Sequence, residues 1–217
     1  MQKRLMKAWS EYRGFALFVI LMIIFRSALA DWNTVPTGSM KPTILEGDRI
    51  LVNKLAYDLL IPLTHVSVFR FADPKRGDIV VFDSKAAGAR LVKRVIGVPG
   101  DVVDMRNNRL RINGIDARYS KLEYAVDVIF ATESYAGMTH RIQLSPAGVS
   151  QYSSFDPVKV PDGHYLVLGD NRDNSADSRV RGFIPRGEIV GEARTVVMSI
   201  DYDHYYLPRL DRFFHGL

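Results

Sequence analysis

The longest apolar run in the chain lies close to its N-terminus. Residues 15–25 (FALFVILMIIF) carry no polar side chain, and Arg26 is the first charge that follows them. Seventeen helical residues around this run extend roughly 25 Å, a little short of the roughly 30 Å hydrocarbon core of a bilayer. Tyr12 and Trp32 flank the run as interfacial aromatic anchors do, and the long stem of Arg26 suits a position near the headgroups. The pattern predicts a single transmembrane helix over residues 14–31.

A second interpretation of this segment stays open. A basic start, a short apolar run and the sequence Ala28-Leu29-Ala30 are also typical of a cleavable secretory signal. Arg26 stands between the run and that sequence, where such signals normally carry no charge, so we favour an uncleaved anchor. Both interpretations export the remainder of the chain.

Charge predicts the orientation of the anchor. Residues 1–13 hold one acidic side chain, Glu11, and four basic ones: Lys3, Arg4, Lys7 and Arg13. The positive-inside rule therefore predicts a cytoplasmic N-terminus over 1–13 and an extracytoplasmic domain over 32–217. The first thirty residues supply four of the five net positive charges, so no basic surface remains to suggest a nucleic-acid partner.

Beyond the predicted anchor, apolar residues occur in short runs separated by turn signals. Five runs predict strands, at residues 49–53, 79–82, 91–96, 165–168 and 189–200. Glycine and proline at the intervening turns, as in Pro99-Gly100-Asp101, support this division. The fold class is therefore mainly β, in a chain long enough to bury one substantial core.

One stretch interrupts this regular pattern. Asn107-Asn108 and Asn113-Gly114 favour a hairpin between residues 102 and 115. Residues 115–160 are weakly patterned, with many small and polar side chains, and indicate an insertion. We expect a small inserted cap or lid at about 104–162.

Several kinds of chemistry are excluded by what the sequence lacks. The chain has no cysteine, which excludes disulfides, thiolate metal sites and cysteine nucleophiles. Its five histidines show no metal-binding spacing, and no Gly-x-Ser-x-Gly elbow or phosphate-binding glycine loop is present. The aspartate-rich stretch 170–177 fails the EF-hand pattern at the positions that require glycine and glutamate. No metal or organic cofactor is expected.

The remaining candidate is a serine with a lysine base. Ser39 lies in a short loop bracketed by Pro36 and Pro42, directly after the predicted anchor. A serine becomes a nucleophile only beside a base, and a neutral lysine can serve when burial lowers its pKa. Lys93 lies in a predicted strand, on the same face as Leu91 and Val95. This apolar setting makes Lys93 the best candidate.

Four ordered segments resemble motifs of the type I signal peptidases, the membrane-anchored Ser-Lys proteases that remove signal peptides from exported proteins. The segments are TGSMKPTI (37–44), RGDIVVF (76–82), KRVIGVPGD (93–101) and GDNRDNSADSR (169–179). The resemblance also covers the anchor. Residues 115–160 lie outside it, at a place where the family carries a variable insertion.

The resemblance implies roles for individual residues. Ser39 would be the nucleophile and Lys93 the general base. The oxyanion would be held by the backbone N–H of Ser39 and by the hydroxyl of Thr37, where the family more often has serine. Ser175 would orient the lysine, while Asp177 and Arg179 would form a supporting ion pair.

The implied substrate is a signal peptide with small residues at positions −3 and −1 from the cut. Shallow apolar pockets would impose this choice because a larger side chain would clash. By position, the wall residues are expected to be Val35, Met40, Ile44 and Val92.

The sequence thus predicts a membrane-bound serine endopeptidase that cleaves preproteins at Ala-x-Ala sites. The expected location is a bacterial inner membrane, with the catalytic domain in the periplasm and with signal peptides, lipid and the export machinery as partners. Two alternatives stay open: a specialised peptidase that matures pilin or another export substrate, and an inactive membrane-tethered β module.

Overall fold

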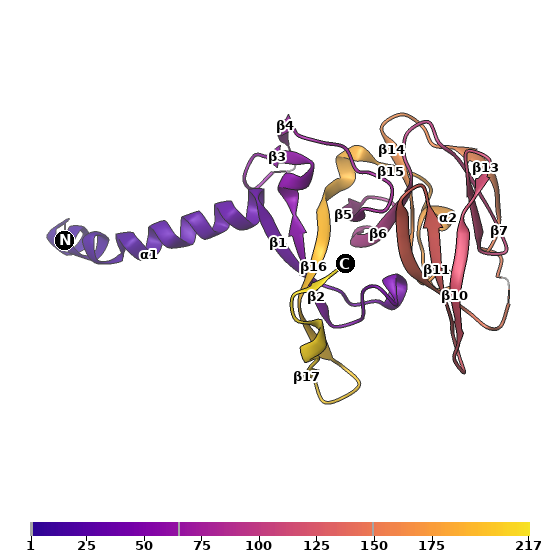
Figure 1. Ribbon diagram of the computed structural model, residues 1–217. Helices are drawn as coiled ribbons and strands as arrows, with labels where there is room; N and C mark the ends of the chain where they lie inside the picture. The colour runs from indigo at the N-terminus through magenta and orange to yellow at the C-terminus, as the bar shows by residue number, and fades with distance from the viewer. Residues whose placement is uncertain (1, 65, 149) are drawn as a thin grey trace.

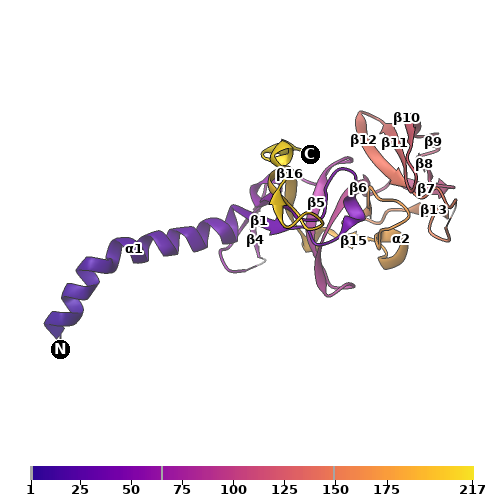
Figure 2. The ribbon, with the colours of Figure 1, turned by 90° about the horizontal axis from the view of Figure 1, so that it is seen from below.

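An N-terminal helix extends away from a β-rich body in the computed structural model of the protein (Figures 1 and 2). The structure describes residues 2–64, 66–148 and 150–217, and for residues 2–11 the backbone alone. Helix α1 (Gln2–Ala28) has 27 residues. From Phe15 to Phe25 every side chain except Ala16 is exposed, with Phe15 at 69% and Ile20 at 53%. The side chains of Lys3, Arg4 and Lys7, on which the orientation was predicted, lie outside the described residues.

The structure does not identify α1 as a transmembrane helix. In the described part of the chain, no helix combines the length and the apolar character needed to cross a membrane.

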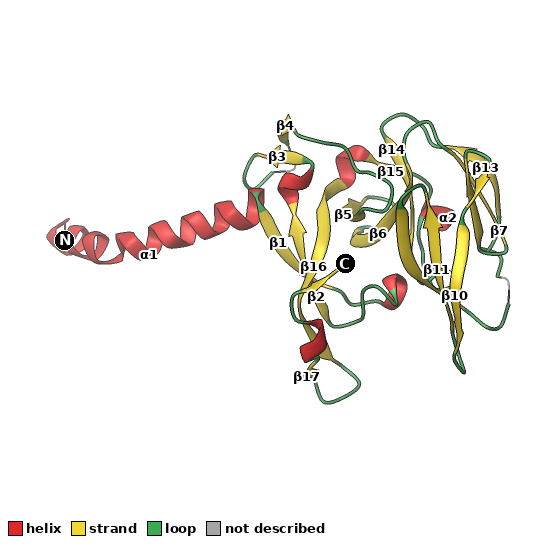
Figure 3. Ribbon diagram, in the orientation of Figure 1, coloured by secondary structure: helices red, strands yellow, loops and turns green. Residues whose placement is uncertain are grey.

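The largest sheet of the body has nine strands (Figure 3). Its main path runs β1-β2-β16-β5-β6-β14-β15, and β17 and β18 both pair with β16. In that order the strands are β1 (Ala30–Thr34), β2 (Asp48–Asn53), β16 (Ile189–Asp201), β5 (Ile79–Ser84), β6 (Ala89–Gly97), β14 (His164–Leu168), β15 (Ile184–Pro185), β17 (Leu207–Pro208) and β18 (His215–Gly216). All five predicted strands lie in this sheet, which confirms the mainly β class.

The two faces of this sheet are both covered. On β5, Val81 belongs to one buried cluster with Ile50 and Val196, whereas Val80 belongs to another with Val95. Because successive side chains of a strand point to opposite faces, burial on both faces produces the continuous apolar runs seen in the sequence.

The chain leaves the large sheet after β6 and returns at β14. Between them, β7 (Val102–Arg106), β8 (Arg109–Ile112), β9 (Ile115–Asp116) and β13 (Phe155–Lys159) form one sheet, and β10 (Arg118–Tyr124), β11 (Ile129–Tyr135) and β12 (Met138–Leu144) form another. The predicted hairpin is confirmed, with Asn107 and Asn108 both at positive φ in the β7–β8 turn. That this segment is a cap stays a prediction.

The weak patterning of residues 115–160 was a poor guide to their structure, because most of them form strands. β10 is exposed along nearly its whole length and therefore shows no alternation of apolar and polar residues. By contrast, β12 does alternate between buried and exposed positions over its first five residues.

Short elements complete the fold. They are the 3₁₀ turns η1 (Gly38–Met40), η2 (Lys54–Ala56), η3 (Arg186–Glu188) and η4 (Leu210–Arg212), the helix α2 (Ser178–Arg181), and the hairpin of β3 (Asp58–Leu60) with β4 (Ser67–Arg70).

The junction between α1 and the sheet is tightly bonded. The Lys54 ammonium donates hydrogen bonds of 2.9 Å to the carbonyl oxygens of Arg26 and Ser27, in the last turn of the helix. The Arg26 guanidinium lies 2.7 Å from an Asp31 carboxylate oxygen and 4.4 Å from the ring centre of Trp32. Arg26 therefore has partners within the protein, whereas the sequence suggested a contact with headgroups.

Candidate active site

The structure brings Ser39 and Lys93 together from elements distant in the sequence. Ser39 lies in η1, which follows β1, and Lys93 lies in the middle of β6. Lys93 Nζ is 2.6 Å from Ser39 Oγ and donates a second hydrogen bond, of 2.9 Å, to the Val92 carbonyl. In the neutral form of the amine, the Ser39 hydroxyl can donate its proton along the shorter bond.

The surroundings of Lys93 disfavour its charged form. Its side chain is almost fully buried, beside Val80 on the neighbouring strand. Burial lowers the pKa of Lys93 to about 8, against an opposing effect of the Asp177 and Asp170 carboxylates. A substantial fraction of Lys93 is therefore neutral at mildly alkaline pH, as a general base requires.

The cations next to Ser39 and Lys93 in the sequence, Lys41 and Arg94, are both paired with carboxylates. Lys41 Nζ lies 3.1 Å from a carboxylate oxygen of Glu46. Arg94 forms a bidentate ion pair with Asp170, with hydrogen bonds of 2.9 and 2.7 Å. Lys93 is thus the amine that contacts Ser39.

The segment over residues 169–179 packs against the backbone of Gly38 and Ser39 and is held by its own ion pair. The Asp177 carboxylate accepts hydrogen bonds of 2.8 and 2.7 Å from the Arg179 guanidinium and one of 2.9 Å from the Gly169 N–H. Ser175 Oγ is buried next to Gly169 and near the Asp177 carboxylate, whose pKa it helps to lower, and the hydrogen bonds of Lys93 go to Ser39 and Val92 instead. The implied bond between Ser175 and Lys93 is therefore absent from this structure.

Gly169 lies where that segment closely approaches the backbone of Ser39. A β-carbon placed on Gly169 would overlap Ser39 O and Ser175 Oγ. Only glycine leaves room for this approach.

A pocket of about 340 Å³ opens beside Ser39. Its lining includes Thr37, Ser39 and Lys93, together with three of the predicted wall residues, Val35, Met40 and Val92. The fourth, Ile44, is not among the residues that line the pocket and is fully buried in the same apolar cluster as Val35 and Met40. Position in the sequence placed Ile44 near the site, but its side chain points into the core.

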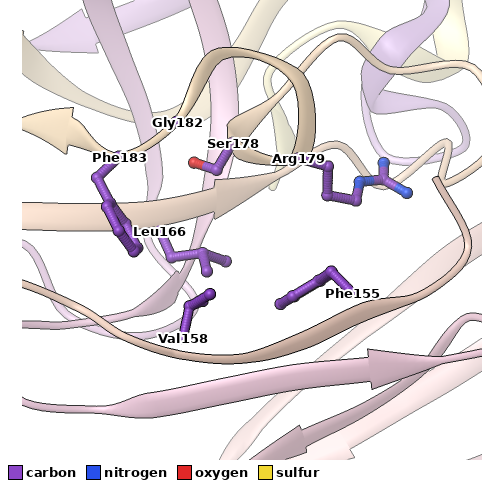
Figure 4. A pocket seen from close by; sticks show the side chains of 7 residues that line it. All are labelled: Phe155, Val158, Leu166, Ser178, Arg179, Gly182 and Phe183. Atoms are coloured by element: carbon purple, nitrogen blue, oxygen red, sulfur yellow. The ribbon is translucent and has the colours of Figure 1, made fainter.

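A second pocket, of about 260 Å³, lies on another part of the body and contains neither Ser39 nor Lys93 (Figure 4). Phe155 and Val158 of β13, Leu166 of β14 and Phe183 provide most of its apolar lining, next to Ser178 of α2.

A buried polar network beside the site was missed by the sequence analysis. Arg172 and Glu133 are both fully buried and form hydrogen bonds of 2.8 and 2.6 Å. His140 Nε2 lies 3.4 Å from Glu133 Oε1 and 3.7 Å from Asp170 Oδ1. Glu133 and His140 belong to β11 and β12, and only the aspartate-rich motif gave any signal, by containing Asp170 and Arg172.

Comparisons with a family model and with individual proteins identify the same family. Residues 8–198 match the model of the family described as signal peptidase, peptidase S26. A signal peptidase I from Pseudomonas fluorescens is 36% identical over 208 residues, covering 87% of this chain and 72% of the relative. One from Rickettsia canadensis is 35% identical over 213 residues, covering 87% and 79%.

Similarity to a solved structure is weaker. A signal peptidase I from Enterococcus faecalis is 28% identical, and the match covers 56% of this chain and 97% of the other, with a TM-score of 0.37. That score is too low for a comparison of the two folds.

Proposed function

This chain belongs to the signal peptidase family, peptidase S26, a family of serine endopeptidases that cleave signal peptides, and on that premise we propose that Ser39 and Lys93 are its catalytic dyad. The observation that supports the assignment most directly is the 2.6 Å distance between Lys93 Nζ and Ser39 Oγ at a buried lysine.

In the proposed acylation, neutral Lys93 takes the proton of the Ser39 hydroxyl as Ser39 Oγ attacks the scissile carbonyl carbon. The resulting oxyanion accepts hydrogen bonds from the Ser39 N–H and the Thr37 hydroxyl. As the tetrahedral intermediate collapses, the Lys93 ammonium gives its proton to the leaving amine, which becomes the N-terminus of the mature protein.

Deacylation repeats this proton transfer with water. Lys93, neutral again, takes a proton from a water molecule that attacks the ester carbon, and then returns it to Ser39 Oγ as the signal peptide leaves. The ion pair of Asp177 with Arg179 supports the loop beside Lys93 throughout.

The substrate is proposed to be an extended signal peptide with small residues at −1 and −3. The pocket beside Ser39 is bounded by residues of β1 and of β6, between which an extended chain can lie. Val35, Met40 and Val92 give this pocket an apolar wall, which favours alanine and excludes larger side chains.

Cleavage is tested with the full chain in detergent and a preprotein that carries an Ala-x-Ala site. The wild type is expected to release the mature protein with the predicted N-terminus, and Ser39→Ala is expected to release none. Ser120→Ala, which alters an exposed serine on β10, serves as the matched control and should remain active.

Substrates with phenylalanine at −1 or −3 should resist cleavage, and equal cleavage of both substrate types would contradict the proposed specificity.

We further propose that α1 anchors the protein in the inner membrane, with residues 1–13 in the cytoplasm and the β body in the periplasm. The exposed apolar side chains between Phe15 and Phe25 support this proposal, since water would otherwise surround them. The protein should stay in the membrane fraction through an alkaline wash and enter solution with detergent. Release by the wash alone would exclude a transmembrane anchor.

A further inference from the structure

Asn171 contacts the backbone on both sides of the Ser39 α-carbon. Its side-chain amide donates a hydrogen bond of 3.0 Å to Gly38 O, and its backbone N–H donates one of 3.1 Å to Ser39 O. Asn171 is buried, at 6% exposure, so these bonds form away from solvent. No other described side chain donates a hydrogen bond to either of the two carbonyl oxygens.

The bond to Gly38 O bears directly on the direction of the Ser39 N–H. Gly38 C=O and Ser39 N–H belong to one planar peptide unit, and in the trans form they point in opposite directions. Holding the oxygen therefore fixes the direction of the N–H. An accepted hydrogen bond also polarises the peptide unit, which makes the N–H a better donor.

The position of Asn171 is set in turn by β12. Gln143 N donates a hydrogen bond of 2.8 Å to Asp170 O, and Arg172 N donates one of 2.9 Å to Gln143 O. Asn171 and Gln143 thereby form a parallel bridge. The side chain of Arg172 is bound to Glu133 of β11. Both residues next to Asn171 are thus attached to the sheet of β10, β11 and β12.

From these contacts we infer that Asn171 is a positioning residue, whose side-chain amide directs the Ser39 N–H toward the oxyanion, and that the β10–β12 sheet holds Asn171 in place. The inference rests on the proposed function, in which the Ser39 N–H stabilises the oxyanion. It also gives the inserted segment a role in catalysis that does not require contact with the substrate.

Loss of the Asn171 amide is expected to lower kcat only partially. Gly38 O also accepts a hydrogen bond of 3.1 Å from Lys41 N, so the loss of the Asn171 amide leaves one bond in place. Deleting an oxyanion donor outright lowers kcat by about 100- to 1000-fold, and a donor that is only misdirected should cost less, about 10- to 100-fold. KM should change little, because the ground-state carbonyl depends less on this donor.

The test compares Asn171→Ala and Asn171→Asp with the wild type, using kcat, KM and the affinity for two ligands. A peptide aldehyde adds to Ser39 Oγ and forms a tetrahedral adduct with an oxyanion-like oxygen, whereas an uncleavable peptide with proline after the cut site only occupies the pocket. Both variants should lose aldehyde affinity in parallel with kcat and keep the affinity for the uncleavable peptide. The aspartate variant keeps the shape of the side chain, so it remains informative should the alanine variant fold poorly.

Asn108→Ala is the matched control. Asn108 is also a buried asparagine, at 7% exposure, and its amide donates a hydrogen bond of 3.0 Å to Asp173 in the same loop, away from Gly38. It should lose stability to a similar degree and keep its kcat. The inference is overturned if either Asn171 variant keeps kcat within about twofold of the wild type, or if Asn108→Ala loses kcat equally. Failure of the proposed function is distinguishable, since Ser39→Ala would then still cleave.

Discussion

Gly169 lies so close to Ser39 that a β-carbon on the glycine would overlap the carbonyl oxygen of the serine. The loop over 169–179 and the segment of Ser39 therefore meet backbone to backbone. The contact leaves no space for an inserted side chain, and it joins the two motifs that carry the candidate site.

Gly169→Ala should accordingly damage both stability and catalysis. The overlapping atoms are the backbone oxygen of Ser39 and the Oγ and Cβ of Ser175, a short buried side chain, so they cannot move aside cheaply. The free energy of unfolding should therefore fall by about 1–3 kcal/mol or more. Displacement of Ser39 should also lower kcat/KM by at least tenfold. Denaturant unfolding and steady-state cleavage measure the two effects. Gly187→Ala, at a glycine with open space around it, should be neutral, and equal behaviour of the two variants would argue against the close contact.

Lys93 should determine the acidic limb of the pH–rate profile. Its pKa is lowered to about 8 by burial, and the amine acts as a base only when it is deprotonated. Below that pH, kcat/KM should therefore fall about tenfold per pH unit. Lys93→Met should be inactive at every pH while keeping its circular dichroism spectrum, whereas the exposed Lys85→Met should match the wild type. A limb that moves when His164 is replaced would assign the ionisation to another group.

The hydroxyl of Thr37 should matter more than its methyl group. Thr37 is exposed in the pocket beside Ser39, where its hydroxyl is the proposed second oxyanion donor. Thr37→Val keeps the shape and removes the donor, so kcat should fall about 100- to 1000-fold, while Thr37→Ser should stay within a few fold of the wild type. Similar kcat values for the valine and serine variants would remove Thr37 from the oxyanion site.

His140 should make the fold sensitive to mild acid. Burial lowers its pKa from 6.5 to about 4, with the carboxylates of Asp170 and Glu133 opposing and the guanidinium groups of Arg94 and Arg172 reinforcing the shift. His140 is therefore protonated near pH 6.5 in the unfolded chain but only near pH 4 in the folded protein. Stability is complete above pH 6.5 and falls between these values, by up to about 3 kcal/mol.

His140→Gln should flatten this dependence when unfolding is measured by urea titration between pH 7 and 5. The lowered pKa values of Glu133 and Asp170 act at lower pH, since their ordinary values are 4.5 and 3.8. His204→Gln alters an exposed histidine and provides the comparison. An unchanged slope in the His140 variant would show that this side chain is not the acid-sensitive group.

The sequence predicted the parts of the fold whose physical cause is local. Strands such as β5 and β14 are buried on both faces, so their apolar runs are visible without any knowledge of their neighbours. Ser39 and Lys93 could be predicted as partners because each lies in a motif with a distinctive sequence.

Interactions between distant polar residues were not predictable in this way. Glu133, His140 and Arg172 are buried, and hydrophobic periodicity carries no signal for charged side chains in a core. Their partners come from different strands, so only the folded chain shows that they meet. The place of Ile44 outside the pocket lining has a related cause, because distance along the chain from Ser39 does not tell which way a side chain points.

The bonded junction of α1 with β1 leaves a single residue, Leu29, between helix and strand. With α1 in a bilayer as proposed, the active site would be held at a fixed distance from the membrane surface. The five residues of β1 extend about 17 Å from this junction toward Ser39. Because helix and strand are joined without a flexible linker, Ser39 cannot move closer to the lipid or farther from it. A preprotein would then be cut only where its own membrane-bound segment presents a bond at that level. Lengthening the junction by a few glycines should shift the cut along the substrate rather than abolish it.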